Sequence, residues 1–400
     1  MSASAAGETG VIYLDHHATT PVDARVLDAM LPYFTRTFGN AASRTHRFGW
    51  EASEAVDRAR RQVASAVGAS AREIVFTSGA TEASYLALAG VVAATPIERR
   101  HAVTVATEHK AVLDHLRQLA DEGWRVTVLP VAPTGLVDLR AVAAALTPGT
   151  ALVSVMLANN EIGVIQPVAE IARLAHAHGA IVHTDAVQAL GRTPVDVRAL
   201  GVDLASFSAH KVYGPKGVGA LYVKRGVEPR LRAPMRGGGQ ERGLRGGTLN
   251  VPGIVGFGAA SEMARAEMAT EAERLGGLRD RLWRRLQDQV GGVSMNGAAS
   301  PRLAGNLNVT FDGVDGESLL LALTDVAVSS GAACTSADPS HVLTALGLST
   351  ERALASLRFG LGRSTTLEDI DRAASHVADV VAYLRASSRR VQLAAGAAGR

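Results

Sequence analysis

Short apolar runs alternate with amphipathic segments between residues 50 and 225. Ala52, Ala55, Val56, Ala59 and Val63 recur at three- and four-residue spacing, which predicts a helix with one apolar face. Strands are predicted at residues 73–77, 102–106, 125–129, 151–155, 180–183 and 203–207, and further helices at 80–94 and 109–122. Continuous apolar strands that alternate with helices indicate an α/β domain, whose mostly parallel sheet is covered on both faces.

The pattern changes after about residue 226. Glycine and arginine dominate residues 236–247, and long helices are expected at 251–289 and 366–384. Strands are fewer and more separated beyond residue 291, as in an α+β domain. We therefore expect a large α/β domain over residues 15–262 and a smaller α+β domain over residues 1–14 and 263–385. The Ala/Gly/Arg-rich residues 386–400 are expected to form a disordered tail.

Composition excludes several classes of protein. The chain has 400 residues and a net charge of +3, from 41 basic and 38 acidic side chains, which is too weak a field to argue for a nucleic-acid partner. No apolar run approaches the ~20 residues that span a bilayer. The first ten residues hold no basic segment, so no presequence is expected.

Cys334 is the single cysteine, which excludes an internal disulfide and indicates a reducing compartment. Taken alone, it is more often an inert buried thiol.

Polar residues follow three of the predicted strands, at the edge where open α/β sheets bind ligands. TSGATE (77–82) opens a helix whose first N–H groups can hold a phosphate, Asp185 follows a buried strand and needs a cation, and Lys211 is an amine in a desolvated setting. Each alone has a plain explanation: a capped helix, a turn-capping carboxylate or a surface lysine. Together they are the set that pyridoxal phosphate (PLP) requires.

These and further motifs resemble the cysteine desulfurases of the class V aminotransferase family, specifically the housekeeping group that supplies sulfur for iron–sulfur clusters. The resemblance runs from Tyr13 to Thr366 and rests on YLDHHATTPVD, FGNAASRTHRFG, REIVFTSGATE, TEHKAVLD, NNEIGVIQP, HTDAVQ, SFSAHKVYGPKG, GGGQERGLRGGT, SSGAACTSA and SLRFGLGR. It implies the fold type I of PLP-dependent transferases, with a mostly parallel seven-stranded sheet, a smaller C-terminal α+β domain and a homodimer.

The resemblance also implies roles for individual residues. Lys211 would bond to PLP and move the substrate α proton, Asp185 would pair with the ring nitrogen, and His109 would stack on the ring as an acid–base group. Arg358 would bind the substrate carboxylate together with Asn160. The other cofactor-binding residues implied are Ala80, Thr81, Asn160, Gln188, Ser208, His210 and, from the neighbouring subunit, Thr248. No metal is expected.

Cys334 lies in SSGAACTSA (329–337), where no large neighbour could bury it. The resemblance implies that its thiolate attacks the sulfur of L-cysteine, which leaves L-alanine and a persulfide on Cys334. That sulfur would serve iron–sulfur cluster assembly or another transfer such as tRNA thiolation. The expected partner is a cytoplasmic sulfur acceptor or scaffold protein, with no direct binding of nucleic acid or membrane.

Two alternatives stay open on the sequence. The first is another PLP enzyme, such as an aminotransferase, a selenocysteine lyase or a β-elimination lyase. An aminotransferase would not need Cys334. The second is a nucleic-acid-binding protein that uses residues 236–247, since Arg/Gly segments bind RNA when disordered. Glu241 and the ordered segments on both sides argue against that use.

Overall fold

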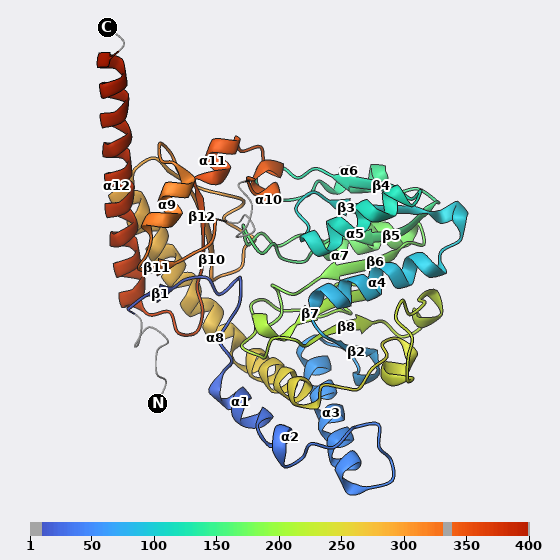
Figure 1. Cartoon of the computed structure of the whole chain (residues 1–400). Coiled ribbons are helices and arrows are strands. Elements are labelled where there is room, and N and C mark those ends of the chain that lie inside the picture. Colours follow the sequence, from blue (N-terminus) through green and yellow to red (C-terminus); the bar gives the residue numbers. More distant parts are fainter. Residues whose placement is uncertain (1–9, 331–337, 399–400) are drawn as a thin grey trace.

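The computed structural model describes residues 10–330 and 338–398. Seven strands form the sheet of the large domain: β2 (Ile74–Thr77), β3 (His101–Val105), β4 (Arg125–Leu129), β5 (Thr150–Ser154), β6 (Ile181–Asp185), β7 (Leu204–Ser208) and β8 (Gly219–Val223). Their order is β2-β8-β7-β6-β5-β3-β4 (Figure 1). β8 is antiparallel to both of its neighbours, and the pairs among β3 to β7 are parallel. The predicted mostly parallel seven-stranded sheet is confirmed.

Helices cover both faces of this sheet because its central strands are buried along their whole length. α4 (Ala80–Ala94) and α5 (Lys110–Asp121) supply apolar side chains to the core on one face. α3 (Arg47–Ala66), α6 (Leu139–Ala145) and α7 (Val168–Ala177) supply those on the other face. The strand ends thus remain as the place where polar side chains meet solvent.

The smaller domain is built on an antiparallel sheet with the order β12-β10-β9, beside a parallel pair of β1 and β11. Its strands are β1 (Ile12–Tyr13), β9 (Val293–Met295), β10 (Asn306–Phe311), β11 (Val326–Ala327) and β12 (Ser356–Gly360). Its helices are α9 (Gly316–Ala322), α10 (His341–Ala345), α11 (Thr350–Leu354) and α12 (Leu367–Ala398). The N-terminal strand therefore joins the C-terminal domain.

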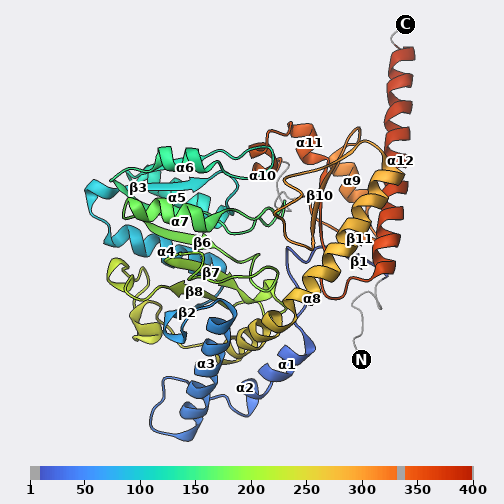
Figure 2. The same ribbon diagram turned by 180° about the vertical axis from the view of Figure 1, so that it is seen from behind.

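One long helix, α8 (Val251–Val290), connects the two domains (Figure 2). Its first half packs with α1 (Ala24–Met30) and α3, and its second half packs with α12. The domain boundary expected at residue 262 falls inside this continuous helix. Among the described residues, no helix is both long enough and apolar enough to cross a membrane.

The C-terminal helix differs from the expectation for the tail. α12 continues from the predicted helix at 366–384 through residues 386–398, which the sequence analysis expects to be disordered. The physical reason is composition, because alanine has the highest helix propensity and arginine ranks close behind. The helix projects beyond the body of the molecule (Figure 1).

The Arg/Gly segment packs against the large domain through a buried acid. Both carboxylate oxygens of Glu241 accept bonds from Arg60, at 2.6 and 2.7 Å, and Phe76 N–H donates to Glu241 at 2.7 Å. Glu241 is 6% exposed and has a φ of 46°, a backbone conformation that strains residues other than glycine. The segment is thus folded here, whereas the RNA-binding alternative requires it to be disordered.

Candidate active site

A cleft of about 680 Å³ lies at the carboxyl ends of β5, β6 and β7, where the two domains meet. The sequence-predicted residues that line it are Ala80, Thr81, His109, Asn160, Asp185, Gln188, Ser208, His210, Lys211 and Arg358. Thr248 does not line it and is exposed. Cys334 lies outside the described residues. The cleft therefore gathers side chains that are far apart in sequence.

Lys211 is held at the end of a short 3₁₀ turn (Ala209–Lys211) that follows β7 directly. Its Nζ donates to the carbonyl oxygens of His17 and Ala18, each at 2.7 Å. Burial, reinforced by the nearby cations Arg192 and Arg358, lowers its pKa from 10.5 to about 7. A large share of Lys211 is therefore a free, nucleophilic amine near neutral pH.

Asp185 is the last residue of β6 and is 7% exposed. Val187 N–H donates to its Oδ1 at 3.0 Å. Burial raises its pKa, while His109, the Val187 N–H and Lys211 oppose that rise. A buried carboxylate that lines a cleft is stabilised by a cation placed against it, such as a protonated ring nitrogen.

The other end of the cleft can hold an anion. Gly79 precedes α4, and a Cβ added there would meet nothing within 4 Å, so the space above the helix N-terminus is open. The first N–H groups of a helix have no partner within the helix and attract negative charge. Ser208, His210 and Lys216 line the same cleft. His210 Nδ1 lies 3.1 Å from Thr19 Oγ1, which fixes the ring.

This donor set fits PLP. Lys211 offers an amine for the aldehyde, Asp185 a carboxylate for the ring nitrogen, and the N-terminus of α4 with Ser208 and His210 a site for the phosphate. His109 lines the cleft as the N-cap of α5, where its Nδ1 accepts from Ala111 N–H at 3.1 Å.

The N-terminal segment supplies residues to which the sequence reasoning assigned no role. His17 is 1% exposed, and its Nδ1 lies 2.9 Å from Gln188 Oε1. Gln188 Nε2 in turn donates to the carbonyl oxygen of His17 at 2.9 Å. Arg192 also donates to Gln188 Oε1, and its Nη2 donates to the Lys211 carbonyl at 3.0 Å. Gln188 is thus tied to the chain around the reactive lysine. In the sequence, the motif YLDHHATTPVD, which contains His17, was the signal that could have pointed to this contact.

A buried acid behind the cleft was also missed. Glu108 has no exposed surface, and its Oε1 accepts from Met156 N–H. Its Oε2 has no hydrogen-bond partner among the described residues. Burial, with the charge of Asp185 nearby, raises the pKa of Glu108 well above its ordinary value. The surroundings of Glu108 therefore favour its protonated form.

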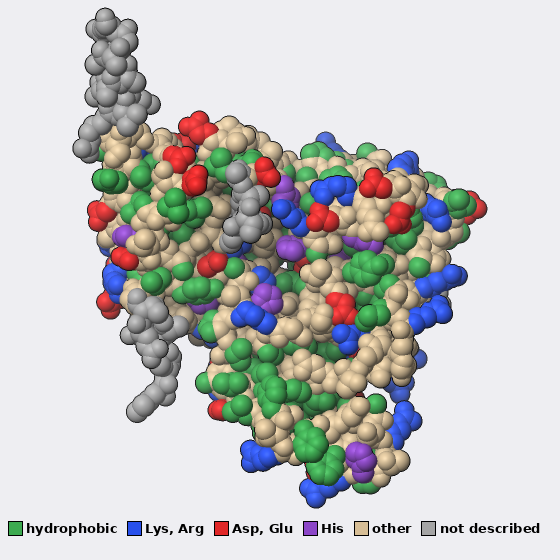
Figure 3. Space-filling view, viewed as in Figure 1, with side chains coloured by type: hydrophobic (Ala, Val, Ile, Leu, Met, Phe, Trp, Pro, Cys, Tyr) green, Lys and Arg blue, Asp and Glu red, His purple; other side chains and the backbone are tan. Residues whose placement is uncertain are grey.

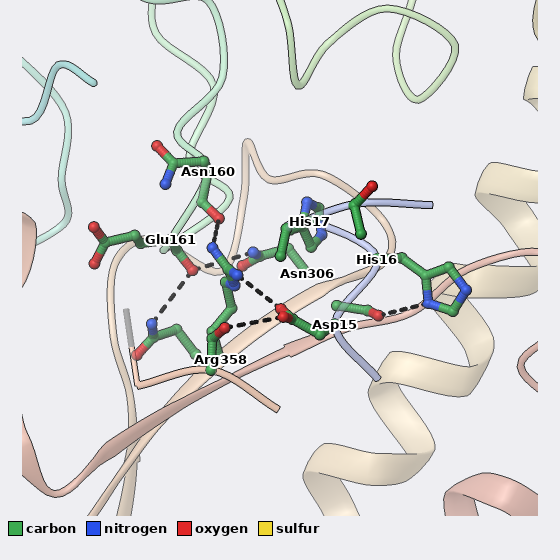
Figure 4. A network of polar contacts seen from close by, with 12 residues as sticks. Asp15, His16, His17, Asn160, Glu161, Asn306 and Arg358 are labelled. Carbon is green, nitrogen blue, oxygen red and sulfur yellow. Dashed lines mark hydrogen bonds and ion pairs between the residues drawn. The ribbon is translucent and has the colours of Figure 1, made fainter. Parts of the chain in front are cut away.

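Arg358 reaches the cleft from β12 of the smaller domain and is 6% exposed. Its Nη2 donates to Asp15 Oδ1 at 2.7 Å and its Nη1 to the Asn160 carbonyl at 3.0 Å (Figure 4). A guanidinium carries five N–H donors in a planar fork that matches a carboxylate. The arginine therefore spans both domains and retains donors for a ligand.

The comparison with protein families decides what kind of protein carries this cleft. The family described as Aminotransferase class-V matches residues 12–373, which is most of the chain. The chain belongs to the class-V aminotransferase family. Within that family it is 55% identical over 379 residues to the cysteine desulfurase IscS of Anaeromyxobacter dehalogenans, with 94% of each protein covered.

Solved structures agree with this family. A NifS-like protein superposes with a TM-score of 0.88 at 38% identity and covers 94% of this chain and 100% of its own. A structure titled as SspA in complex with cysteine has a TM-score of 0.79 at 36% identity, covering 87% of this chain and 98% of its own. The family and its fold, a mostly parallel seven-stranded sheet with a smaller C-terminal domain, therefore hold for this chain.

Proposed function

We propose that this chain is a homodimeric, PLP-dependent cysteine desulfurase, which converts L-cysteine to L-alanine and leaves the sulfur as a persulfide on Cys334. One observation carries the proposal. The Lys211 amine, the Asp185 carboxylate and the Arg358 guanidinium line one cleft, although they come from the turn after β7, from the end of β6 and from β12 of the smaller domain. Membership of the class-V family supports the same reading.

The residues of the large domain would hold the cofactor and move protons. Lys211 would bond to PLP through Nζ, Asp185 would keep the ring nitrogen protonated, and Gln188, Asn160 and His109 would contact the ring. When bound, PLP supplies an electron-accepting ring that stabilises charge developing at the substrate Cα. Lys211 Nζ, whose lowered pKa of about 7 makes the free amine available near neutral pH, would accept the α proton and return it.

The phosphate contacts would come from both subunits. Ala80, Thr81, Ser208 and His210 line the anion end of the cleft in this chain. Thr248 would complete that end in the neighbouring subunit, which agrees with its position outside the cleft and its exposure.

Arg358 would recognise the substrate carboxylate. Its buried position means that few water molecules compete for its donors, and a bidentate contact would fix the orientation of the amino acid. The Asn160 carbonyl, which accepts from Nη1, would hold the guanidinium in place beside the cofactor site.

Sulfur transfer would take place at Cys334. The thiolate sulfur bonds to the sulfur of L-cysteine, and the bond from that sulfur to the substrate Cβ breaks. The electron pair of the broken bond stays with Cβ, which takes up a proton, so that the carbon skeleton leaves as L-alanine. The overall balance is L-cysteine plus Cys334 thiol giving L-alanine plus Cys334 persulfide, with no external oxidant.

The test incubates purified, PLP-loaded protein with L-cysteine and measures alanine release together with the mass of the peptide that contains Cys334. We expect alanine and one added sulfur atom on that peptide. The variant Cys334→Ala should lose desulfuration, whereas transamination of an amino acid, if present, should persist. Alanine released with no sulfur on Cys334 would refute the mechanism.

The dimer has a candidate interface in the N-terminal helices. Large apolar side chains with exposed fractions from 45% to 63% gather over α1, α2 (Pro32–Thr35) and the start of α3: Leu27, Leu31, Phe34, Phe38, Phe48 and Trp50 (Figure 3). Monomeric proteins rarely expose so many large apolar groups together. We expect light scattering to give the mass of two chains, and Phe34→Glu combined with Phe38→Glu to give one. A wild-type monomer would contradict the dimer and the role of Thr248.

The sulfur acceptor would be a protein of iron–sulfur cluster assembly or of tRNA thiolation, in the cytoplasm. The single cysteine supports a reducing compartment. Mixing the persulfide form with candidate acceptor proteins should move the added sulfur from Cys334 to an acceptor thiol, which mass spectrometry of both proteins would detect.

A further inference from the structure

The carboxylate of Asp15 lies between two groups of the smaller domain. Its Oδ1 accepts from Arg358 Nη2 at 2.7 Å (Figure 4). Its Oδ2 accepts from Ser329 Oγ at 3.0 Å. The side chain of Asp15 is 17% exposed and that of Arg358 is 7% exposed, so water screens this ion pair only weakly. One carboxylate thus touches both the cleft arginine and Ser329.

The backbone fixes the same three residues. Arg358 N–H donates to the Ser329 carbonyl at 2.7 Å, and Ser329 N–H donates back at 3.4 Å. Asp15 forms a parallel bridge with Gly360, two residues beyond Arg358. Because Ser329 is bonded to Arg358 through the backbone and to Asp15 through its hydroxyl, a change in the ion pair acts directly on Ser329. Ser329 lies five residues before Cys334 in the sequence.

We propose that Asp15 is a positioning residue: it shares its carboxylate between Arg358 and Ser329, and so couples the binding of a substrate carboxylate at Arg358 to the chain segment that leads to Cys334. This inference rests on the proposed function, in which Arg358 receives the carboxylate of L-cysteine.

The hydrogen-bond donors of Arg358 explain how a carboxylate bound there would affect Asp15. Two of its five N–H groups are engaged, by Asp15 and by the Asn160 carbonyl. Its Nε is buried and has no hydrogen-bond partner among the described residues. A second carboxylate on this guanidinium competes with Asp15 for the same positive charge, because like charges around one cation repel each other. Asp15 then interacts less with Arg358 and more with the Ser329 hydroxyl.

The competition between Asp15 and the substrate carboxylate for Arg358 determines whether removal of Asp15 raises or lowers the affinity for substrate. Replacing Asp15 by asparagine keeps the shape and removes the competing charge, so the substrate carboxylate becomes the stronger counter-ion of a buried guanidinium. The KM for L-cysteine and the inhibition constant of the product L-alanine should both fall, by about tenfold. A role in folding alone would lower the amount of active protein and leave both constants unchanged.

The matched control is Asp23→Asn. Asp23 also joins the N-terminal segment to the smaller domain through an arginine, at 3.0 Å from Arg363, and its side chain is 14% exposed. It does not line the cleft. We expect this variant to leave both constants within about twofold of wild type. Thermal unfolding of each variant separates loss of fold from loss of binding.

A second readout uses the single cysteine. Iodoacetamide can alkylate only Cys334, so the mass change of the PLP-loaded protein reports the reactivity of that thiol. We expect saturating L-alanine to change the alkylation rate in wild type, and to leave it unaltered in Ser329→Ala and Asp15→Asn. Ser329→Ala keeps the ion pair intact, so it remains informative if Asp15→Asn fails to fold.

The outcomes separate the two proposals. If wild-type protein releases no alanine from L-cysteine, the proposed function fails before any variant is compared. If wild type is active but the constants of Asp15→Asn match those of Asp23→Asn, or rise, the competition is wrong. If Ser329→Ala responds to L-alanine as wild type does, the coupling to the segment before Cys334 is wrong.

Discussion

The two sides of the cleft are built in different ways. On the large-domain side, Asp185 ends the buried strand β6, and Lys211 follows β7 in a short turn where its Nζ donates to two backbone carbonyls. On the small-domain side, the ladder between β12 and β10 fixes the backbone of Arg358, but its guanidinium is held by an ion pair with the Asp15 side chain and by the Asn160 carbonyl. Contacts of a side chain with the backbone are rigid, whereas an ion pair between two side chains adjusts to a competing charge. The chemistry of the site therefore lies on the rigid side and recognition of the substrate on the adjustable side.

The largest effect is expected from removing the amine on the rigid side. Lys211→Ala should lower the rate of alanine formation by about a thousandfold or more, because both the bond to PLP and the proton carrier are lost. Lys224→Ala is the matched control, since that lysine pairs with Asp203 at 3.2 Å and does not line the cleft. Equal rates in the two variants would show that Lys211 is a structural lysine.

A smaller loss is expected from the carboxylate of the same side. Asp185→Asn should reduce kcat by about a hundredfold, since an amide cannot hold a proton on the ring nitrogen. The matched control is Asp203→Asn. Asp203 is 6% exposed against 7% for Asp185, but it lies just before β7, at the opposite end of the strands. That control should lose stability but keep kcat, as measured by thermal unfolding and by alanine release.

The lowered pKa of Lys211 gives a pH test. Protein freed of PLP should take up the cofactor at a rate that rises about tenfold per pH unit below pH 7 and levels off above it, because only the neutral amine reacts. An ordinary lysine with a pKa of 10.5 would still gain rate above pH 9, whereas a pKa of about 7 predicts a plateau. The rate is followed by the change in absorbance of PLP on binding.

The last prediction concerns the stability of the fold and Glu161, a large-domain residue whose polar partners lie in the smaller domain. Glu161 is 4% exposed, its Oε2 accepts from the Ser340 hydroxyl, and its carbonyl accepts from Asn306 Nδ2 at 3.1 Å. Burial raises its pKa from 4.5 to about 7, although Ser340, Arg358 and Lys110 oppose the rise. The folded state therefore disfavours ionised Glu161. As the pH rises from 4.5 to 7, the free energy of unfolding falls.

Glu161→Gln should remove this pH-dependent loss of stability, because a neutral amide mimics the protonated acid. Relative to wild type, the variant should be nearly equally stable at pH 4.5 and should gain about 3 kcal/mol by pH 7, with little further gain above that pH. Urea unfolding at several pH values measures the difference. A constant difference at all pH values would mean that Glu161 does not titrate in this range.

Sequence reasoning located the large domain well because its elements are strongly patterned. Helix α4 has the predicted bounds, and strand β4 was predicted at residues 125–129, as observed. β8 was missed, since its single antiparallel position in the sheet depends on tertiary pairing with β2 and β7. Asp15 was read only as part of a motif, because its two partners lie more than 300 residues away along the chain.

The site was predictable to the extent that strand ends converge. Asp185 and Lys211 follow adjacent strands, so the topology of a parallel sheet brings them to one edge. The polar surroundings of Gln188 were not predictable, because His17 and Arg192 reach it by side-chain geometry that no spacing encodes. Residues 331–337, with Cys334, lie outside the described residues, and the role of that thiol stays a prediction.

The continuity of α8 limits how the length of this chain can vary. Its 40 residues pass from one domain to the other without a break, so each added residue would lengthen the helix by about 1.5 Å and turn everything after it by about 100°. Insertion of a single alanine near Gly276 or Gly277 would swing Arg358 away from Lys211, even though a Cβ at either glycine meets nothing within 4 Å. Substitutions at these two glycines are thus tolerated, whereas insertions and deletions are not.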